Sequence, residues 1–85
     1  MTPNPIHGAV DIEWEIASPA ETAIRVYDLA GRAVATVAAG RFEAGRHRAH
    51  WDGRNSAGSA APAGWYVVRV ARGDGRADHR VLLLR

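Results

Sequence analysis

Side chains that could hold a metal ion gather in the middle of the chain. His47 and His50 are three residues apart, so in an extended segment they point to opposite faces and do not readily share a zinc ion. Asp52, Asn55 and Ser56 offer oxygen ligands of the kind that calcium prefers, but their spacing is not that of an EF-hand loop. A turn needs the same residue types, so we expect a turn here and no bound metal. The other two histidines are His7 and His79.

Three serines in turn-rich segments, Ser18, Ser56 and Ser59, are the candidate nucleophiles. None of them lies in the Gly-x-Ser-x-Gly pattern that presents a catalytic serine at a nucleophile elbow. The chain contains no lysine, so neither Schiff-base catalysis nor a lysine–asparagine isopeptide crosslink is open to it. The sequence therefore predicts a protein that is not an enzyme and has no catalytic residue and no cofactor.

The basic residues other than histidine are all arginine, and eleven of them against nine carboxylates give a formal charge of +2 at pH 7. This low charge and the interspersed carboxylates favour an ordinary solvated face over a nucleic-acid interface. The arginines that could have formed such an interface are Arg41, Arg46, Arg48, Arg54 and Arg72. There is no cysteine, so neither disulfides nor thiolate zinc sites hold the fold together.

The alternation of apolar and polar side chains predicts that β-strands position these groups. Residues 10–16 alternate apolar and acidic side chains, which is the period of a strand with one buried face. Asp28 and Gly31 are expected to shape one hairpin loop, and Gly73-Asp74-Gly75 another. The predicted strands cover residues 9–16, 23–28, 34–37, 45–51, 64–72 and 76–84.

An alanine-rich stretch, residues 33–44, is the one segment in which a helix is a serious alternative, because alanine is the best helix former. Gly31, Gly40 and Gly45 would confine such a helix to fewer than about ten residues, which is marginal without clear caps. We therefore expect a strand. Six or seven short strands separated by turns and no helical period predict an all-β fold, an antiparallel β-sandwich.

The predicted strand at residues 64–72 has two chemically different faces. Tyr66, Val68 and Val70 are expected in the core, with the Tyr66 hydroxyl bonded to the backbone as in a tyrosine corner. The other face carries Trp65, Val67 and Arg69. Either neighbouring side chains or the loop at residues 52–63 cover this second face, or it is a docking patch for a partner.

The three tryptophans raise carbohydrate binding as an alternative function, because sugars stack on exposed indoles. Trp14 and Trp51 occupy core-facing positions, which leaves only Trp65 for such a role. A glycan is therefore a weaker alternative to a protein partner.

Six segments, in the same order along nearly the whole chain, resemble one family. They are Asn4-Pro5, Ile24-Arg25-Val26-Tyr27-Asp28-Leu29-Ala30-Gly31-Arg32-Ala33-Val34, Ala44-Gly45-Arg46-His47, Trp51-Asp52-Gly53-Arg54, Gly64-Trp65-Tyr66 and Val81-Leu82-Leu83-Leu84-Arg85. The chain resembles the immunoglobulin-like domain of the flagellar hook-capping protein and the similar C-terminal domains of large secreted bacterial proteins, including type IX secretion sorting domains. The resemblance implies one domain over residues 1–85, an immunoglobulin-like β-sandwich of six to seven strands.

The same resemblance implies a non-catalytic C-terminal accessory domain of a secreted or cell-surface protein, which acts in export or surface attachment through its folded surface. The translocation machinery would recognise the folded domain and its final strand, which comprises His79, Arg80, Val81, Leu82, Leu83, Leu84 and Arg85. The alternative is structural packing in an extracellular filament or a hook-cap-like assembly. The implied partners are proteins: the parent polypeptide, the secretion machinery or neighbouring subunits.

Length and hydropathy agree with such a module. A chain of 85 residues suits one domain with one core. No apolar run approaches the roughly 20 residues that span a bilayer, and the first residues lack the basic-then-apolar order of a signal peptide. We expect an extracellular or cell-surface location, with the export signal on an upstream part of a longer protein.

Overall fold

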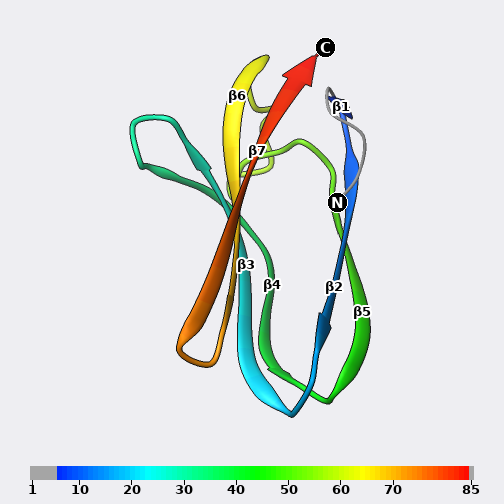
Figure 1. Cartoon of the computed structure of the whole chain (residues 1–85). Helices are drawn as coiled ribbons and strands as arrows, with labels where there is room; N and C mark the ends of the chain where they lie inside the picture. The colour runs from blue at the N-terminus through cyan, green and yellow to red at the C-terminus, as the bar shows by residue number, and fades with distance from the viewer. Residues whose placement is uncertain (1–5, 85) are drawn as a thin grey trace.

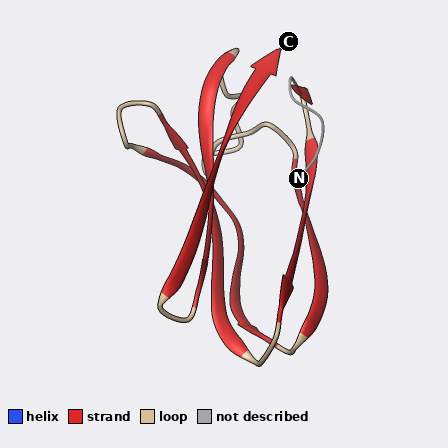
Figure 2. Ribbon diagram, viewed as in Figure 1, coloured by secondary structure: helices blue, strands red, loops and turns tan. Residues whose placement is uncertain are grey.

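The computed structural model describes residues 6–84, which form seven β-strands and no helix (Figures 1 and 2). The strands are β1 (Ile6–His7), β2 (Val10–Ile16), β3 (Ala20–Asp28), β4 (Ala33–Phe42), β5 (Gly45–Trp51), β6 (Gly64–Arg72) and β7 (Gly75–Leu84). A five-stranded sheet in the order β1-β7-β6-β3-β4 faces a two-stranded sheet of β2 and β5. The predicted all-β, immunoglobulin-like sandwich is confirmed, although one pairing, β1 with β7, is parallel.

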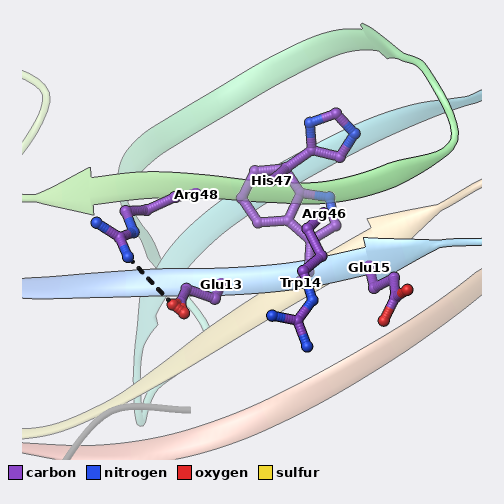
Figure 3. Close-up of a pocket in the computed structure, with 6 residues that line it drawn as sticks. All are labelled: Glu13, Trp14, Glu15, Arg46, His47 and Arg48. Atoms are coloured by element: carbon purple, nitrogen blue, oxygen red, sulfur yellow. Dashed lines mark hydrogen bonds and ion pairs between the residues drawn. The ribbon is translucent and has the colours of Figure 1, made fainter.

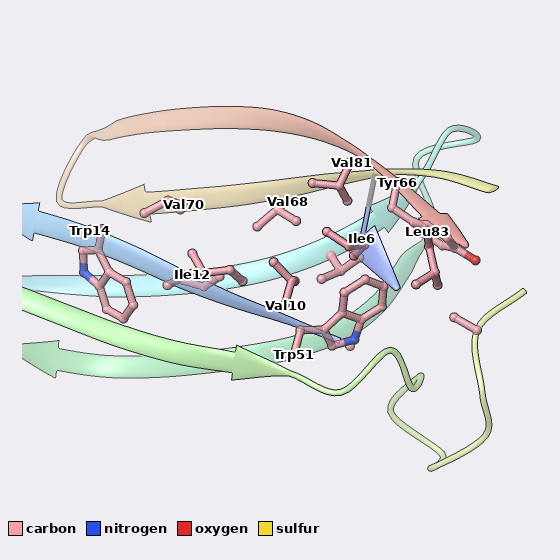
Figure 4. Packing of buried hydrophobic residues seen from close by; sticks show 14 of the residues in the cluster. Ile6, Val10, Ile12, Trp14, Trp51, Tyr66, Val68, Val70, Val81 and Leu83 are labelled. Atoms are coloured by element: carbon pink, nitrogen blue, oxygen red, sulfur yellow. The ribbon is translucent and has the colours of Figure 1, made fainter. Parts of the chain in front are cut away.

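The core lies between the two sheets and consists of apolar side chains at alternate positions (Figure 4). In β2 every second residue is buried and the acidic residues between them are exposed, as the alternation predicts. In β6 the buried set is Tyr66, Val68 and Val70, again as predicted. The buried core members are Ile6, Val10, Ile12, Trp14, Ile16, Ile24, Val26, Ala35, Trp51, Ala61, Tyr66, Val68, Val70, Val81 and Leu83.

Two aromatic side chains close one end of the core with hydrogen bonds to the backbone. The Tyr66 hydroxyl donates to the Pro62 carbonyl at 2.6 Å, which confirms the predicted tyrosine corner. The indole N–H of Trp51 donates to the Arg54 carbonyl at 3.0 Å, and its ring lies 5.7 Å from that of Tyr66. These bonds tie the loop at residues 52–63 to the sandwich, because both accepting carbonyls belong to that loop.

The alanine-rich stretch forms β4, and it is longer than the predicted strand at residues 34–37. β4 pairs with β3 from Ala20 opposite Phe42 to Tyr27 opposite Ala33, with two register shifts on the way. The backbone hydrogen bonds of this ladder hold the segment extended, so its tertiary pairing overrides the helix preference of alanine. β3 also begins three residues earlier than predicted, because it continues this pairing.

The hairpin between β3 and β4 shows why its residues were recognisable in the sequence. Gly31 has a φ of 86°, a conformation that side-chain-bearing residues rarely adopt. The Asp28 carboxylate accepts hydrogen bonds from the backbone N–H groups of Ala30 and Arg32 at 3.0 and 2.9 Å. The turn is therefore set by one glycine and one aspartate.

Candidate interaction surface

The candidate residues of β6 lie on the solvent-facing side of β3, β4, β6 and β7, which we call the outer face. Trp65 lies opposite Leu82 of β7, Val67 opposite Arg80, and Arg69 opposite Asp78. From β3, Tyr27 lies opposite Val67, and Arg25 opposite Arg69. Three central strands thus bring the sequence-predicted trio of Trp65, Val67 and Arg69 together with residues that are far away in the chain.

The final strand contributes only part of its predicted set to a surface. Val81 and Leu83 are 1% and 0% exposed and belong to the core, so they are not accessible to a partner while the domain is folded. Arg80 and Leu82 lie on the outer face, and Leu84 is half-buried opposite His7 of β1. His79 lies on the core side of β7, opposite Val68, yet is exposed. Arg85 lies outside the described residues.

Trp65 is the largest exposed apolar side chain on the outer face, with 45% of its surface accessible. Its backbone is fixed by the ladder to β7 on one side, and the next residue, Tyr66, is anchored by its hydroxyl. The indole is therefore held on rigid backbone while its ring remains in contact with water. Of the other two tryptophans, Trp14 is 8% and Trp51 is 3% exposed, as their core-facing positions predict.

Arg69 is the centre of a small polar cluster on the outer face. Its Nε and Nη2 donate to the two carboxylate oxygens of Asp78 at 2.9 and 3.3 Å, and its guanidinium lies 4.9 Å from the centre of the Tyr27 ring. The hydrogen bond with Asp78 raises the pKa of Arg69, and the same bond lowers the pKa of Asp78. The cluster therefore places the guanidinium of Arg69, held in one orientation by Asp78, beside the Tyr27 ring.

An open hollow lies beside this cluster, at the end of the face where the β3–β4 hairpin begins. Leu29 from the hairpin is 58% exposed and lines it. The other lining residues are Tyr27, Asp28, Gly31, Val67, Arg69, Asp78 and Arg80. The hollow therefore combines an apolar wall with a charged wall, a composition that can seat one side chain of another protein.

The outer face is positively charged although the whole chain is nearly neutral. Five arginines lie on it against two carboxylates, Glu21 and Asp78. The arginines are Arg25, Arg41, Arg69, Arg76 and Arg80. Such a face attracts acidic surfaces, and the attraction weakens as salt concentration rises.

The opposite sheet carries a different pattern, which Figure 3 shows from the solvent side. A second hollow is lined by Glu13 and Glu15 of β2, by Arg46 and Arg48 of β5, and by Trp14 and His47 between them. Arg48 donates to Glu13 at 3.4 Å, and the side chains of both are more than half exposed. Because both side chains are exposed to solvent, this ion pair contributes little to the stability of the fold.

The residues with metal-binding chemistry are used within the fold. His47 is half-buried against the Trp14 and Phe42 rings, and His50 is exposed beside Asp11, so the two histidines face opposite sides as predicted. Within residues 6–84, no three histidines or carboxylates come together in a group that could hold a metal ion.

The loop residues with oxygen ligands also serve the backbone. The Asn55 side-chain oxygen accepts from the N–H groups of Ala57 and Ser59, both at 3.0 Å, and Asp52 accepts from that of Arg54. The Ser56 hydroxyl donates to the Val34 carbonyl at 3.3 Å. These contacts confirm the predicted turn.

Sequence reasoning did not place Tyr27, Leu29, Asp78 or Arg76 on the candidate surface. The alternation in residues 23–28 puts Arg25 and Tyr27 on the same face of their strand, but it does not say which strand is the neighbour. The pairing of β3 with β6 supplies that information, and only the folded chain contains it.

Comparisons with known proteins agree with this geometry. A family model described as the FlgD Ig-like domain matches residues 4–76. The crystal structure of dimeric latent PorU from Porphyromonas gingivalis contains a similar fold, with a TM-score of 0.72 and 18% sequence identity over 96% of this chain. The match covers 9% of that PorU chain. No curated protein matches the sequence.

The described residues include no helix of the length and apolarity needed to cross a membrane.

Proposed function

Because the chain belongs to the family of FlgD Ig-like domains, we propose that it is a non-catalytic accessory domain of a secreted or cell-surface bacterial protein. It acts in export or surface attachment, presenting its outer face to a protein of the secretion machinery. The observation that carries this proposal is Trp65, a rigidly held indole that is 45% exposed on an arginine-rich face. Tryptophan and arginine are the residue types most enriched among interface hot spots.

The chemistry of the outer face specifies what the partner should offer. An apolar recess would take up the Trp65 indole, and carboxylates beside it would pair with Arg80 and with the arginines farther along the outer face. Leu29 and Leu82 extend the apolar contact on either side of Val67. The partner is therefore a protein with an acidic rim around an apolar centre. In this proposal, residues 1–85 are one module of a longer exported polypeptide.

A reporter fusion tests this role. The chain is fused to the C-terminus of a reporter in a bacterium with a type IX secretion system, and the reporter is measured at the cell surface. Deleting residues 79–85 would remove the buried Val81 and Leu83 and would unfold the domain, so a pair of outward-facing substitutions, Arg80→Ser and Leu82→Ser, is the better variant. We expect export of the wild-type fusion and a marked loss with the pair. Intracellular retention of a folded wild-type fusion would contradict the proposal.

A second candidate is structural packing in an extracellular assembly, which the exposed Leu29 and Trp65 also favour, because neighbouring subunits bury such side chains. A packing module self-associates or binds its neighbours with no secretion system present, and sedimentation velocity of the isolated domain measures this. Carbohydrate binding through Trp65 would appear instead as retention on a glycan column that Trp65→Ala abolishes.

A further inference from the structure

The two sheets differ in width, and this leaves one side of the sandwich open. β7, β6, β3 and β4 span three strand spacings, about 14 Å, whereas β2 and β5 span one, about 5 Å. β1 pairs with β7 and leads into β2 through Gly8 and Ala9, so β2 lies on the β7 side (Figure 1). Among residues 6–84 no strand pairs with the other edge of β2.

The core side of β7 becomes uncovered along this open side. On this side of β7, Leu83 and Val81 are buried, whereas His79 is exposed and Ala77 is only half-buried. β1 is only two residues long and reaches only Leu83 and Leu84. A third strand beside β2 would lie over the uncovered half of β7, because it would add one spacing of about 4.8 Å on that side.

The charges on β2 indicate what such a strand must carry. The solvent-facing residues of β2 are all carboxylates, and those of β5 opposite them are all basic: Asp11 with His50, Glu13 with Arg48, and Glu15 with Arg46. Figure 3 shows the last two of these pairs. Two of these pairs are close, at 2.7 Å for Asp11 with His50 and 3.4 Å for Glu13 with Arg48. Side chains directly opposite each other in a sheet favour opposite charge, so a new neighbour of β2 should carry cations at alternate positions.

A second copy of this chain does not meet that requirement. Pairing β2 with β2 of the copy would set two rows of carboxylates against each other. Pairing β2 with β5 of the copy would place successive copies about 10 Å apart, the spacing of two strands. The larger sheets are about 14 Å wide, so those of neighbouring copies would collide.

We propose that the free edge of β2 binds an extended segment of another chain as an added strand. Arginine or lysine at every second position of that segment lies beside Asp11, Glu13 and Glu15, and the apolar residues between them cover Ala77 and His79 of β7. Main-chain hydrogen bonds to β2 supply affinity and the alternating side chains supply specificity. This site is on the sheet opposite the outer face, so it stands or falls independently of the proposed docking through Trp65.

A synthetic peptide tests the edge directly. The probe is a nine-residue, terminally blocked peptide in which Arg and Val alternate, and its control carries Glu in place of each Arg. Both are titrated to millimolar concentration into the isotope-labelled domain. We expect shifts and slower hydrogen exchange at the β2 amides with the Arg peptide alone. No change at β2, or equal changes with the Glu peptide, would overturn the proposal.

Two further comparisons separate strand addition from loose charge attraction. The double variant Glu13→Gln, Glu15→Gln should weaken binding roughly 2-fold to 30-fold, whereas the double variant Glu21→Gln, Glu43→Gln, with the same charge change away from the β2 edge, should leave it unchanged. Two N-methylated forms of the peptide carry the methyl groups on odd or on even residues. In an added strand, the N–H groups of every second residue point toward β2 and those of the residues between them point to solvent. Only the form whose methyl groups point to solvent should therefore bind. Equal binding by both forms would contradict an added strand.

Discussion

The three tryptophans show how the position of one residue type decides its role. Trp65 is held at the surface, Trp51 closes the core with a hydrogen bond to the Arg54 carbonyl, and Trp14 is buried between Phe42 and His47. The indole N–H of Trp14 has no hydrogen-bond partner among the described residues. Sequence parity predicts which indoles are buried, but it does not predict which indole N–H finds an acceptor.

That difference predicts unequal costs of removing the indole N–H. Trp51→Phe should reduce the free energy of unfolding by about 1 kcal/mol more than Trp14→Phe, because only Trp51 loses a hydrogen bond. Urea unfolding followed by circular dichroism measures both variants. An equal or larger loss for Trp14→Phe would show that the Trp51 bond does not stabilise the fold.

The ion pair of Arg69 with Asp78 predicts a pH dependence of stability. Arg69 lowers the pKa of Asp78 below its ordinary value of about 3.9. A carboxyl whose pKa is lower in the folded state stabilises the fold above about pH 4 and loses this effect as the pH falls through the folded pKa. Asp78→Asn should therefore lower the melting temperature at pH 7, and its difference from the wild type should shrink below pH 4.

The exposure of this pair keeps the expected effect small, because solvent screens it. Asp74→Asn in the β6–β7 turn is the matched control, since Asp74 forms no ion pair among the described residues. A difference between wild type and Asp78→Asn that stays constant from pH 7 to pH 2 would rule out the ion pair as its cause.

At the scale of elements, the hairpins depend on glycines whose backbone other residues avoid. Gly31→Ala should destabilise the domain by about 1 kcal/mol, because Gly31 has a φ of 86°, which is unfavourable for alanine. An added Cβ would meet no other atom within 4 Å, so the cost comes from the backbone conformation alone. Gly31→Asn should cost less, since asparagine tolerates this conformation. Thermal unfolding of both variants provides the measurement.

Gly75 is the control for that prediction. It is not among the described glycines with positive φ, and an added Cβ would meet only the Arg72 carbonyl oxygen, at an ordinary 3.7 Å. Gly75→Ala should therefore be neutral or slightly stabilising. Equal losses for Gly31→Ala and Gly75→Ala would mean that the turn conformation is not the cause.

The long strands and their buried faces are predictable from the sequence, but their ends and partners are less so. β2, β5, β6 and β7 were predicted to within one residue, because period-2 alternation and flanking turn residues are local signals. β4 was predicted too short, because its alanines carry no alternation and its length comes from pairing with β3. β1 was not predicted, since two residues contain no period and this strand exists only through its contact with β7.

At the scale of the whole molecule, the sandwich has two chemically different exterior sides. The outer face gathers arginines, Tyr27 and Trp65 from strands that are distant in sequence, whereas the two-stranded sheet carries paired charges of both signs. The acidic row on β2 was visible in the sequence, but the basic row of β5 that lies opposite it follows from the register. The charge of the outer face was hidden, because the low net charge averages over both sides.

Export of the reporter fusion with single outer-face substitutions tests docking through this face most directly. The variants are Trp65→Ala and Arg76→Glu, with Arg46→Glu on the opposite sheet as the matched charge reversal, and all are checked for wild-type melting. Docking through the outer face predicts that surface display falls at least about tenfold for Trp65→Ala, the effect of losing a hot-spot residue, falls for Arg76→Glu and is unchanged for Arg46→Glu. Wild-type display by a folded Trp65→Ala, or equal loss in both charge reversals, would contradict it.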